Sequence, residues 1–149
     1  MTPPESNPTT AAVTVEVRYA ETDQMGVVHH SVYPVWFELA RTEFCRQTGY
    51  PYDRIEASGY HLLVTRLSVD YRRSARYPDR VTTECWIERL AGRGLRFSYR
   101  VAANGSQLAR GTTDHVWIDA ASGKPCRMPE HLSGPFAELA GTRAGPLSR

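Results

Sequence analysis

Residues 31–49, with the sequence SVYPVWFELARTEFCRQTG, are the segment that most constrains the fold. Their apolar side chains recur at the spacing of a helix, and the run ends at Gly49, a residue that suits the left-handed end of a helix. The apolar side chains occupy more than one helical face, so we expect a long helix that is largely enclosed by the rest of the chain. They are Val32, Val35, Trp36, Leu39, Ala40, Phe44 and Cys45.

Four segments after this helix have the composition of β-strands. Residues 62–73, 80–91, 95–105 and 107–120 are rich in β-branched and aromatic side chains, and turn-like residues separate them. Before the helix, residues 13–19 alternate between apolar and polar side chains, which indicates a half-buried first strand. Short connections favour antiparallel neighbours. The sequence therefore predicts an α+β fold, an antiparallel sheet of about five strands with one long helix covering one face.

The length and composition favour one globular domain. The chain has 149 residues, of which 41% are hydrophobic and 23% charged, as in ordinary globular proteins. We expect a disordered lead over residues 1–12, one domain over 13–140 and a flexible tail over 141–149. No apolar run reaches the roughly 20 residues of a membrane-spanning helix, and the polar amino terminus does not resemble a secretory signal. A cytoplasmic location is the expectation.

Several classes of function find no support in the sequence. The cysteines, Cys45, Cys85 and Cys126, are widely separated and indicate neither a disulfide framework nor a zinc site. The histidines are scattered and match no metal-binding spacing, so we expect no metal and no cofactor. The net charge is only +2, and no interleaved basic and aromatic motif for nucleic acid is present.

The loop before the long helix carries the candidate chemistry. Asp23 stands in a glycine-containing loop, seven residues before His30 at the predicted helix start. The first N–H groups of a helix are unpaired and carry a partial positive charge, so they stabilise an oxygen that becomes negative in a transition state. A carboxylate beside such a group either attacks an acyl carbonyl or activates water. Without that context, Asp23 would be read as an ordinary turn residue or helix cap.

The run TDQMGVVHHSVY, followed by WFELAR, resembles the signature of the 4-hydroxybenzoyl-CoA thioesterase family, T-D-x-x-G-[IV]-V-x-H-x-x-Y before a central helix. The resemblance covers about residues 13–130 and implies a hotdog fold, in which the antiparallel sheet wraps around the helix. One upstream position departs, because Glu16 stands where the family prefers Gln or Arg. The matching residues are Thr22, Asp23, Gly26, Val27, Val28, His30 and Tyr33.

The resemblance implies roles for particular residues. Asp23 matches the catalytic carboxylate, and the backbone N–H of His30 matches the oxyanion donor, with a catalytic His30 imidazole as the alternative. Family members work as homodimers with active sites at the subunit interface, often paired again as dimers of dimers. The acyl group is then enclosed partly by the partner subunit. The substrate-binding candidates around the motif, and at the glycine where relatives bring backbone close to the acyl group, are Gly26, Val28, Tyr33 and Gly59.

Arg72 and Arg73 are the remaining substrate-binding candidates. They belong to a basic cluster around the turn that follows the second predicted strand. Coenzyme A carries phosphates and an acyl carrier protein is acidic, so arginines at this place suit either carrier. The plain alternative is a solvated, charged surface.

Three functions are compatible with these residues. The first is hydrolysis of an acyl-CoA thioester to the free acid and CoA. The second is the same reaction on an acyl carrier protein, and the third is acyl-CoA binding without hydrolysis. A binding module has no evident need for Asp23 beside the thioester, so we predict a thioester hydrolase. The acyl group, and the choice between a nucleophilic and a general-base carboxylate, stay open at this level.

Overall fold

The computed structural model describes residues 7–141 and 145–146. In chain order the elements are β1 (Thr10–Glu16), a 3-10 turn (Tyr19–Glu21), α1 (Val32–Gln47), α2 (Tyr52–Ala57), β2 (Tyr60–Tyr71), β3 (Arg80–Leu90), β4 (Gly94–Ala103), β5 (Ser106–Asp119), β6 (Pro125–Cys126), α3 (Glu130–Ala140) and β7 (Gly145–Pro146). The long helix and the four strands β2 to β5 lie close to the ranges that the sequence predicts.

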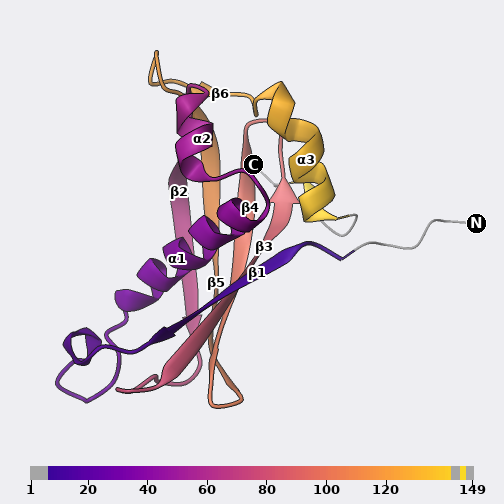
Figure 1. Ribbon diagram of the computed structural model, residues 1–149. Helices are drawn as coiled ribbons and strands as arrows, with labels where there is room; N and C mark the ends of the chain where they lie inside the picture. Colours follow the sequence, from indigo (N-terminus) through magenta and orange to yellow (C-terminus); the bar gives the residue numbers. More distant parts are fainter. Residues whose placement is uncertain (1–6, 142–144, 147–149) are drawn as a thin grey trace, which may run out of the picture.

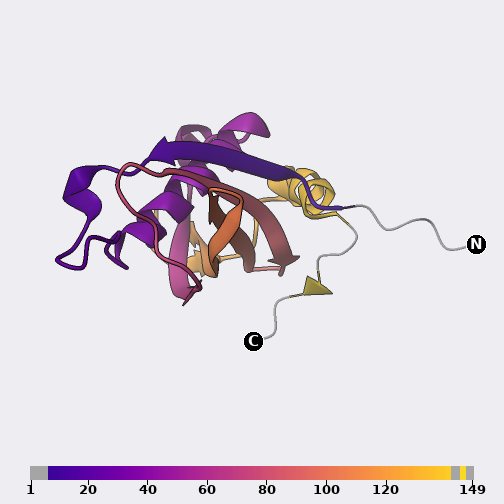
Figure 2. The same ribbon diagram turned by 90° about the horizontal axis from the view of Figure 1, so that it is seen from below.

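The five long strands are ordered β1-β3-β4-β5-β2, and every neighbouring pair is antiparallel. The two-residue strands β6 and β7 pair with β5 and β3. Figure 1 shows α1 lying across one face of the sheet, and Figure 2 shows the sheet curving around that helix. The predicted α+β architecture, with an antiparallel sheet around one long helix, is confirmed. At one end of the strand order, β2 pairs only with β5 among the described residues.

The contact between α1 and the sheet is made by aromatic rings. The ring of Phe37 stacks on that of Tyr99 in β4, with centroids 4.2 Å apart and planes 5° apart. Gly111 in β5 makes this contact possible, because a Cβ atom there would overlap the Phe37 ring and the backbone oxygen of Ser68. Close-packed interiors leave little freedom for such overlaps. The glycine therefore sets how closely α1 approaches the sheet.

Three boundaries differ from the sequence predictions. β1 begins at Thr10, inside the segment expected to be a disordered lead, because residues 10–16 pair in register with β3. Within the expected tail, β7 pairs with the end of β3. Helix α3 was not predicted, since Gly134 and Pro135 are poor helix formers. The other residues of the lead and tail at 1–6, 142–144 and 147–149 lie outside the described part of the chain.

The expectation that α1 is largely enclosed is wrong for one flank. Val35 is 50% exposed and Leu39 is 42% exposed, although both are large apolar residues of the helix. The first turns of α1 extend past β2, the last strand of the sheet, so no strand in the described part of the chain covers that side (Figure 1). The result is an apolar flank that is open in the single chain.

A buried network of hydrogen-bonded side chains links α1 to β4 and β5. The Arg41 guanidinium is buried and donates to the Tyr52 hydroxyl at 2.8 Å and to the Tyr99 hydroxyl at 3.1 Å. The Tyr99 hydroxyl lies 2.6 Å from the Thr113 hydroxyl, which in turn lies 2.7 Å from His115 Nε2. Buried polar groups are costly unless they are hydrogen-bonded, and this network supplies partners for the Arg41 guanidinium, the Tyr99 hydroxyl and His115 Nε2, while His115 Nδ1 meets no partner among the described residues.

His115 makes the stability of the fold depend on pH. Burial, with a smaller contribution from the Arg41 charge, lowers the pKa of His115 to about 3. The unfolded chain has the ordinary value of about 6.5 and binds the proton first, so stability present above that pH is lost as the pH falls. We expect the free energy of unfolding to decrease by about 2 kcal/mol between pH 7 and pH 5. Urea unfolding at both pH values measures this, and a smaller decrease is expected for His115→Asn; an equal decrease in that variant would contradict the assignment.

Candidate active site

The loop between β1 and α1 folds back on itself as a short hairpin. Thr22 forms an isolated antiparallel bridge with Val28, and the His29 N–H donates to the Glu21 carbonyl at 2.8 Å. These bonds close residues 21–29 at their base. The hairpin lies beyond the end of the sheet, at the lower left of Figure 1, and leads directly into α1.

Asp23 lies at the tip of this hairpin and is fixed by its neighbours. Its N–H donates to the Val27 carbonyl and its carbonyl accepts from the Gly26 N–H, both at 2.9 Å. Its Oδ1 accepts from the Met25 N–H at 2.9 Å, so Asp23 does serve as a turn residue. Gly26 has φ of +77°, a value that favours glycine in the turn. Among the described residues Oδ2 has no donor, so one carboxylate oxygen is available to a substrate or water.

His30 follows the hairpin and precedes α1. Its carbonyl accepts a hydrogen bond of 2.7 Å from the Tyr71 hydroxyl, which ties the helix start to the end of β2. Over the described residues, the His30 N–H meets no protein acceptor. The exposed imidazole lies against the His29 ring, with centroids 4.1 Å apart. The structure therefore holds the main chain at His30 and leaves its N–H free, as an oxyanion donor requires.

Five of the predicted site residues line one cavity at this helix start, with a volume of about 170 Å³. Tyr33 is buried there with its ring 5.0 Å from that of Tyr71, and burial raises the pKa of Tyr33. Sequence reasoning missed Tyr71, because its place in the strand alternation carries no sign of the bond to His30. The lining residues are Val28, His30, Tyr33, Tyr71, Arg72, Arg73 and Ser74.

The remaining three candidates do not line this cavity. Asp23 and Gly26 lie at the hairpin tip, beside the cavity wall formed by Val28. Gly59 lies at the other end of β2, where it has φ of +99° and its carbonyl accepts from the Ala120 N–H at 2.9 Å. Within one chain, the length of β2 separates Gly59 from the His30 end of that strand.

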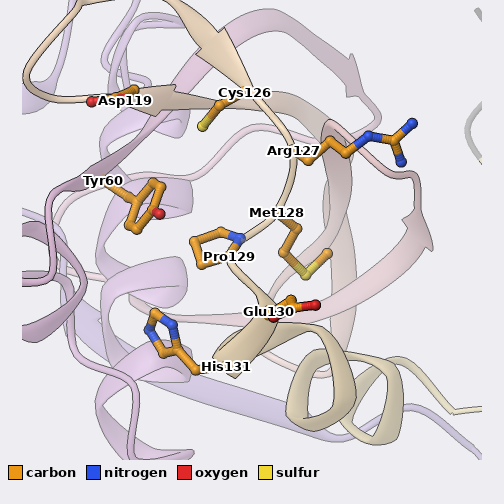
Figure 3. Close-up of a pocket in the computed structure, with 8 residues that line it drawn as sticks. All are labelled: Tyr60, Asp119, Cys126, Arg127, Met128, Pro129, Glu130 and His131. Atoms are coloured by element: carbon orange, nitrogen blue, oxygen red, sulfur yellow. The ribbon is translucent and has the colours of Figure 1, made fainter.

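A larger cavity, of about 780 Å³, lies at that far end, between β2, β6 and the start of α3. In Figure 3 the rings of Tyr60, Pro129 and His131 lie along one side, while the Arg127 guanidinium points away from them. This cavity is broadly open and does not contain the predicted carboxylate or helix start. Size alone does not make it the better candidate. Its lining residues are Tyr60, Asp119, Cys126, Arg127, Met128, Pro129, Glu130 and His131.

Neither a metal site nor a membrane-spanning helix is found in the described part of the chain. In the described part of the chain, no three side chains of the His, Cys, Asp and Glu types gather closely enough to hold a metal ion. Over the same residues, no helix combines the length and apolar character needed to span a membrane.

The curved antiparallel sheet around one long helix is the hotdog fold, and solved structures share it closely. A hypothetical protein TT1821 from Thermus thermophilus superposes with a TM-score of 0.82 and is 40% identical, covering 87% of this chain and 98% of that one. The DHNA-CoA thioesterase from Staphylococcus aureus gives a TM-score of 0.83 at 30% identity, covering 88% and 91% of the two chains.

Sequence comparison identifies the family. Residues 17–136 match the thioesterase-like superfamily, and the chain belongs to that family. YneP of Bacillus subtilis, which carries the provisional name acyl-CoA thioesterase, is 34% identical over 115 residues, 76% of this chain and 83% of YneP. The matched region includes the hairpin, α1 and every long strand except β1.

Proposed function

We propose that this chain hydrolyses an acyl-CoA thioester to the free acid and CoA, using the Asp23 carboxylate and the backbone N–H of His30. The observation that carries the proposal is the His30 N–H, two residues before α1, beside the hairpin that fixes Asp23; among the described residues neither this N–H nor Asp23 Oδ2 has a hydrogen-bond partner. Membership of the thioesterase-like superfamily and the names of the relatives support the reaction class. Steady-state release of the CoA thiol tests the proposal.

In this reaction the thioester carbonyl oxygen accepts a hydrogen bond from the His30 N–H, which stabilises negative charge as the carbonyl carbon becomes tetrahedral. Asp23 either attacks that carbon, giving an anhydride that water then opens, or removes a proton from the attacking water. Both routes break the carbon–sulfur bond, deliver a proton to the leaving thiolate and consume one water. Either route requires the carboxylate itself, not merely an acceptor for the Met25 N–H.

A homodimer that pairs two β2 strands accounts for the open apolar side of the chain. Leu63 and Leu67 on β2 are 53% and 45% exposed, next to a strand edge that pairs with no other strand of the described residues. Unpaired edges with exposed apolar side chains are templates for pairing with another chain. A two-fold axis perpendicular to the sheet pairs β2 with its copy in antiparallel fashion and keeps both α1 helices on the same face.

The same pairing completes the site. Leu63 and Leu67 are placed symmetrically about Thr65, and an axis at that residue sets the partner's Gly59 opposite Tyr71. The Tyr71 hydroxyl donates to the His30 carbonyl, so this pairing brings the partner's Gly59 close to the His30 end of the first chain. Within one chain, Gly59 lies at the opposite end of β2. This arrangement explains why sequence resemblance assigns Gly59 to the site although it lies at the far end of its own strand.

Leu67→Asp is expected to convert the dimer to monomers and to remove most thioesterase activity, because it buries a charge in the proposed interface. Sedimentation velocity reports the assembly state, and circular dichroism confirms that the monomer is folded. Ser133→Asp, at an exposed position on α3, is the matched control and keeps the wild-type assembly and activity. A fully active Leu67→Asp dimer would refute the β2 interface.

We further propose that two such dimers associate into a tetramer and that the protein is cytoplasmic. The first follows from the resemblance to family members that assemble in this way. The second follows from the sequence expectation. Neither changes which residues act on the thioester.

A further inference from the structure

Two consecutive arginines at the end of β2 face the same side of the sheet edge. The N–H groups of Arg72 and Arg73 both donate to the Leu108 carbonyl, at 2.8 Å and 3.0 Å. Two residues opposite one is the geometry of a β-bulge, which turns neighbouring side chains out of strict alternation. Both arginines accordingly line the His30 cavity and also a second cavity beside it.

The second cavity lies between these arginines and the β4–β5 turn, with a volume of about 390 Å³. Asn104 and Gly105, at φ of +53° and +74°, form the tight two-residue turn. The turn holds Ser106 against Arg73, with Nη1 and Oγ 3.5 Å apart. We call this the turn cavity; its lining residues are Arg72, Arg73, Gly105, Ser106 and Gln107.

The part of the chain that the structure describes does not balance the positive charge of the turn cavity. Within residues 7–141, neither Arg72 nor Arg73 forms an ion pair with a carboxylate. Arg96 on the same sheet contrasts with them, since it bonds Asp114 at 2.6 Å. Asp79, across the turn, already accepts hydrogen bonds from the Asn104 amide and the Arg76 N–H. Over the described residues, both guanidinium groups thus keep a charge that no carboxylate pairs, and Arg73 is held by Ser106 alone, so both can bind an anion.

We infer that the turn cavity binds the phosphates of the nucleotide end of coenzyme A. Guanidinium groups match phosphate oxygens in geometry and charge. The cavity shares Arg72 and Arg73 with the His30 cavity, so a single extended molecule with its thioester at His30 passes the same two arginines. This inference rests on the proposed function. It assigns Ser106 a role in holding the Arg73 side chain and makes CoA, rather than a carrier protein, the preferred thiol.

The test compares acyl-CoA, acyl-3′-dephospho-CoA and acyl-pantetheine that carry the same acyl group. For the wild-type chain, kcat/KM is expected to fall in that order. For Arg73→Gln, kcat/KM for acyl-CoA is expected to fall by about 10- to 100-fold, the effect of losing one charge-assisted hydrogen bond. The ratio of kcat/KM for acyl-CoA to kcat/KM for acyl-pantetheine is therefore expected to be smaller than in the wild-type protein. Arg93→Gln, an exposed arginine at the β3–β4 turn, is the matched control and keeps the wild-type ratio.

Calorimetric binding of free CoA and free pantetheine separates this inference from the proposed function. CoA affinity that falls in Arg73→Gln but not in Arg93→Gln supports the phosphate site, even if no substrate is hydrolysed. If Arg73→Gln changes neither the CoA affinity nor the ratio of kcat/KM for acyl-CoA to kcat/KM for acyl-pantetheine, the phosphate site is overturned. Continued hydrolysis of acyl-CoA would then still leave the proposed function intact. Faster turnover of acyl carrier protein than of acyl-CoA, unaffected by Arg73→Gln, also overturns the phosphate site.

Discussion

Asp23→Asn is expected to lower kcat/KM for an acyl-CoA by about 10²- to 10⁴-fold, the range for loss of a positioned acid–base group. The asparagine keeps a side-chain oxygen in the position of Oδ1, so it still accepts the Met25 N–H and preserves the turn. What it removes is the negative charge and the basic or nucleophilic oxygen. Thiol-release kinetics measure the loss, and KM is expected to change much less than kcat.

Asp23→Ala provides the control for the hairpin. It removes both the carboxylate and the acceptor of the Met25 N–H, so its activity should be no higher than that of the asparagine variant and its stability slightly lower. Folding and assembly of both variants are checked by circular dichroism and sedimentation. Wild-type turnover by folded Asp23→Asn would eliminate the carboxylate mechanism.

Gly111→Ala is expected to destabilise the protein by about 3 kcal/mol, because the added methyl group overlaps the Phe37 ring and the Ser68 backbone oxygen. Neither neighbour yields easily, since Phe37 is fully buried against Tyr99 and Ser68 belongs to the adjacent strand. Urea unfolding measures the change. Because Phe37 lies on the helix that begins at the candidate site, a displaced α1 is also expected to lower turnover.

Gly134→Ala is the matched substitution in open space. No atom lies within 4 Å of a Cβ placed at Gly134, which is an exposed residue of α3. Alanine in a helix is favoured over glycine by about 0.5–1 kcal/mol, so this variant is expected to be stabilised. Equal effects of the two substitutions would contradict the claim that Gly111 sets the approach of α1.

The fold was largely predictable because its elements carry strong local patterns. Residues 31–49 have the helical period, and the segments that became β2 to β5 have the composition and turns of antiparallel strands. What local patterns cannot express is tertiary pairing. β1 begins at Thr10 because β3 pairs with it there, and α3 forms despite Pro135 because Leu132 and Phe136 are buried in the core.

The site was predictable only in part, since a motif names residues near one another in sequence. The hairpin and helix start came from such a motif and are adjacent in the structure. Tyr71, which bonds His30, comes from a strand far along the chain and gave no local signal. Likewise, Val35 and Leu39 fit the helical period of the core residues yet are exposed in the chain, because periodicity along one helix does not show which of its flanks the sheet covers.

The central claim is that this chain turns over acyl-CoA thioesters at the Asp23 hairpin. A thiol-release assay of the wild-type protein across aryl, short, medium and long acyl-CoAs, with Asp23→Asn alongside, tests it most directly. We expect many equivalents of free CoA per subunit for at least one acyl class, and release near background for the variant. Tight acyl-CoA binding by the folded wild-type protein, with no thiol released from any acyl class, would contradict it and indicate a binding module.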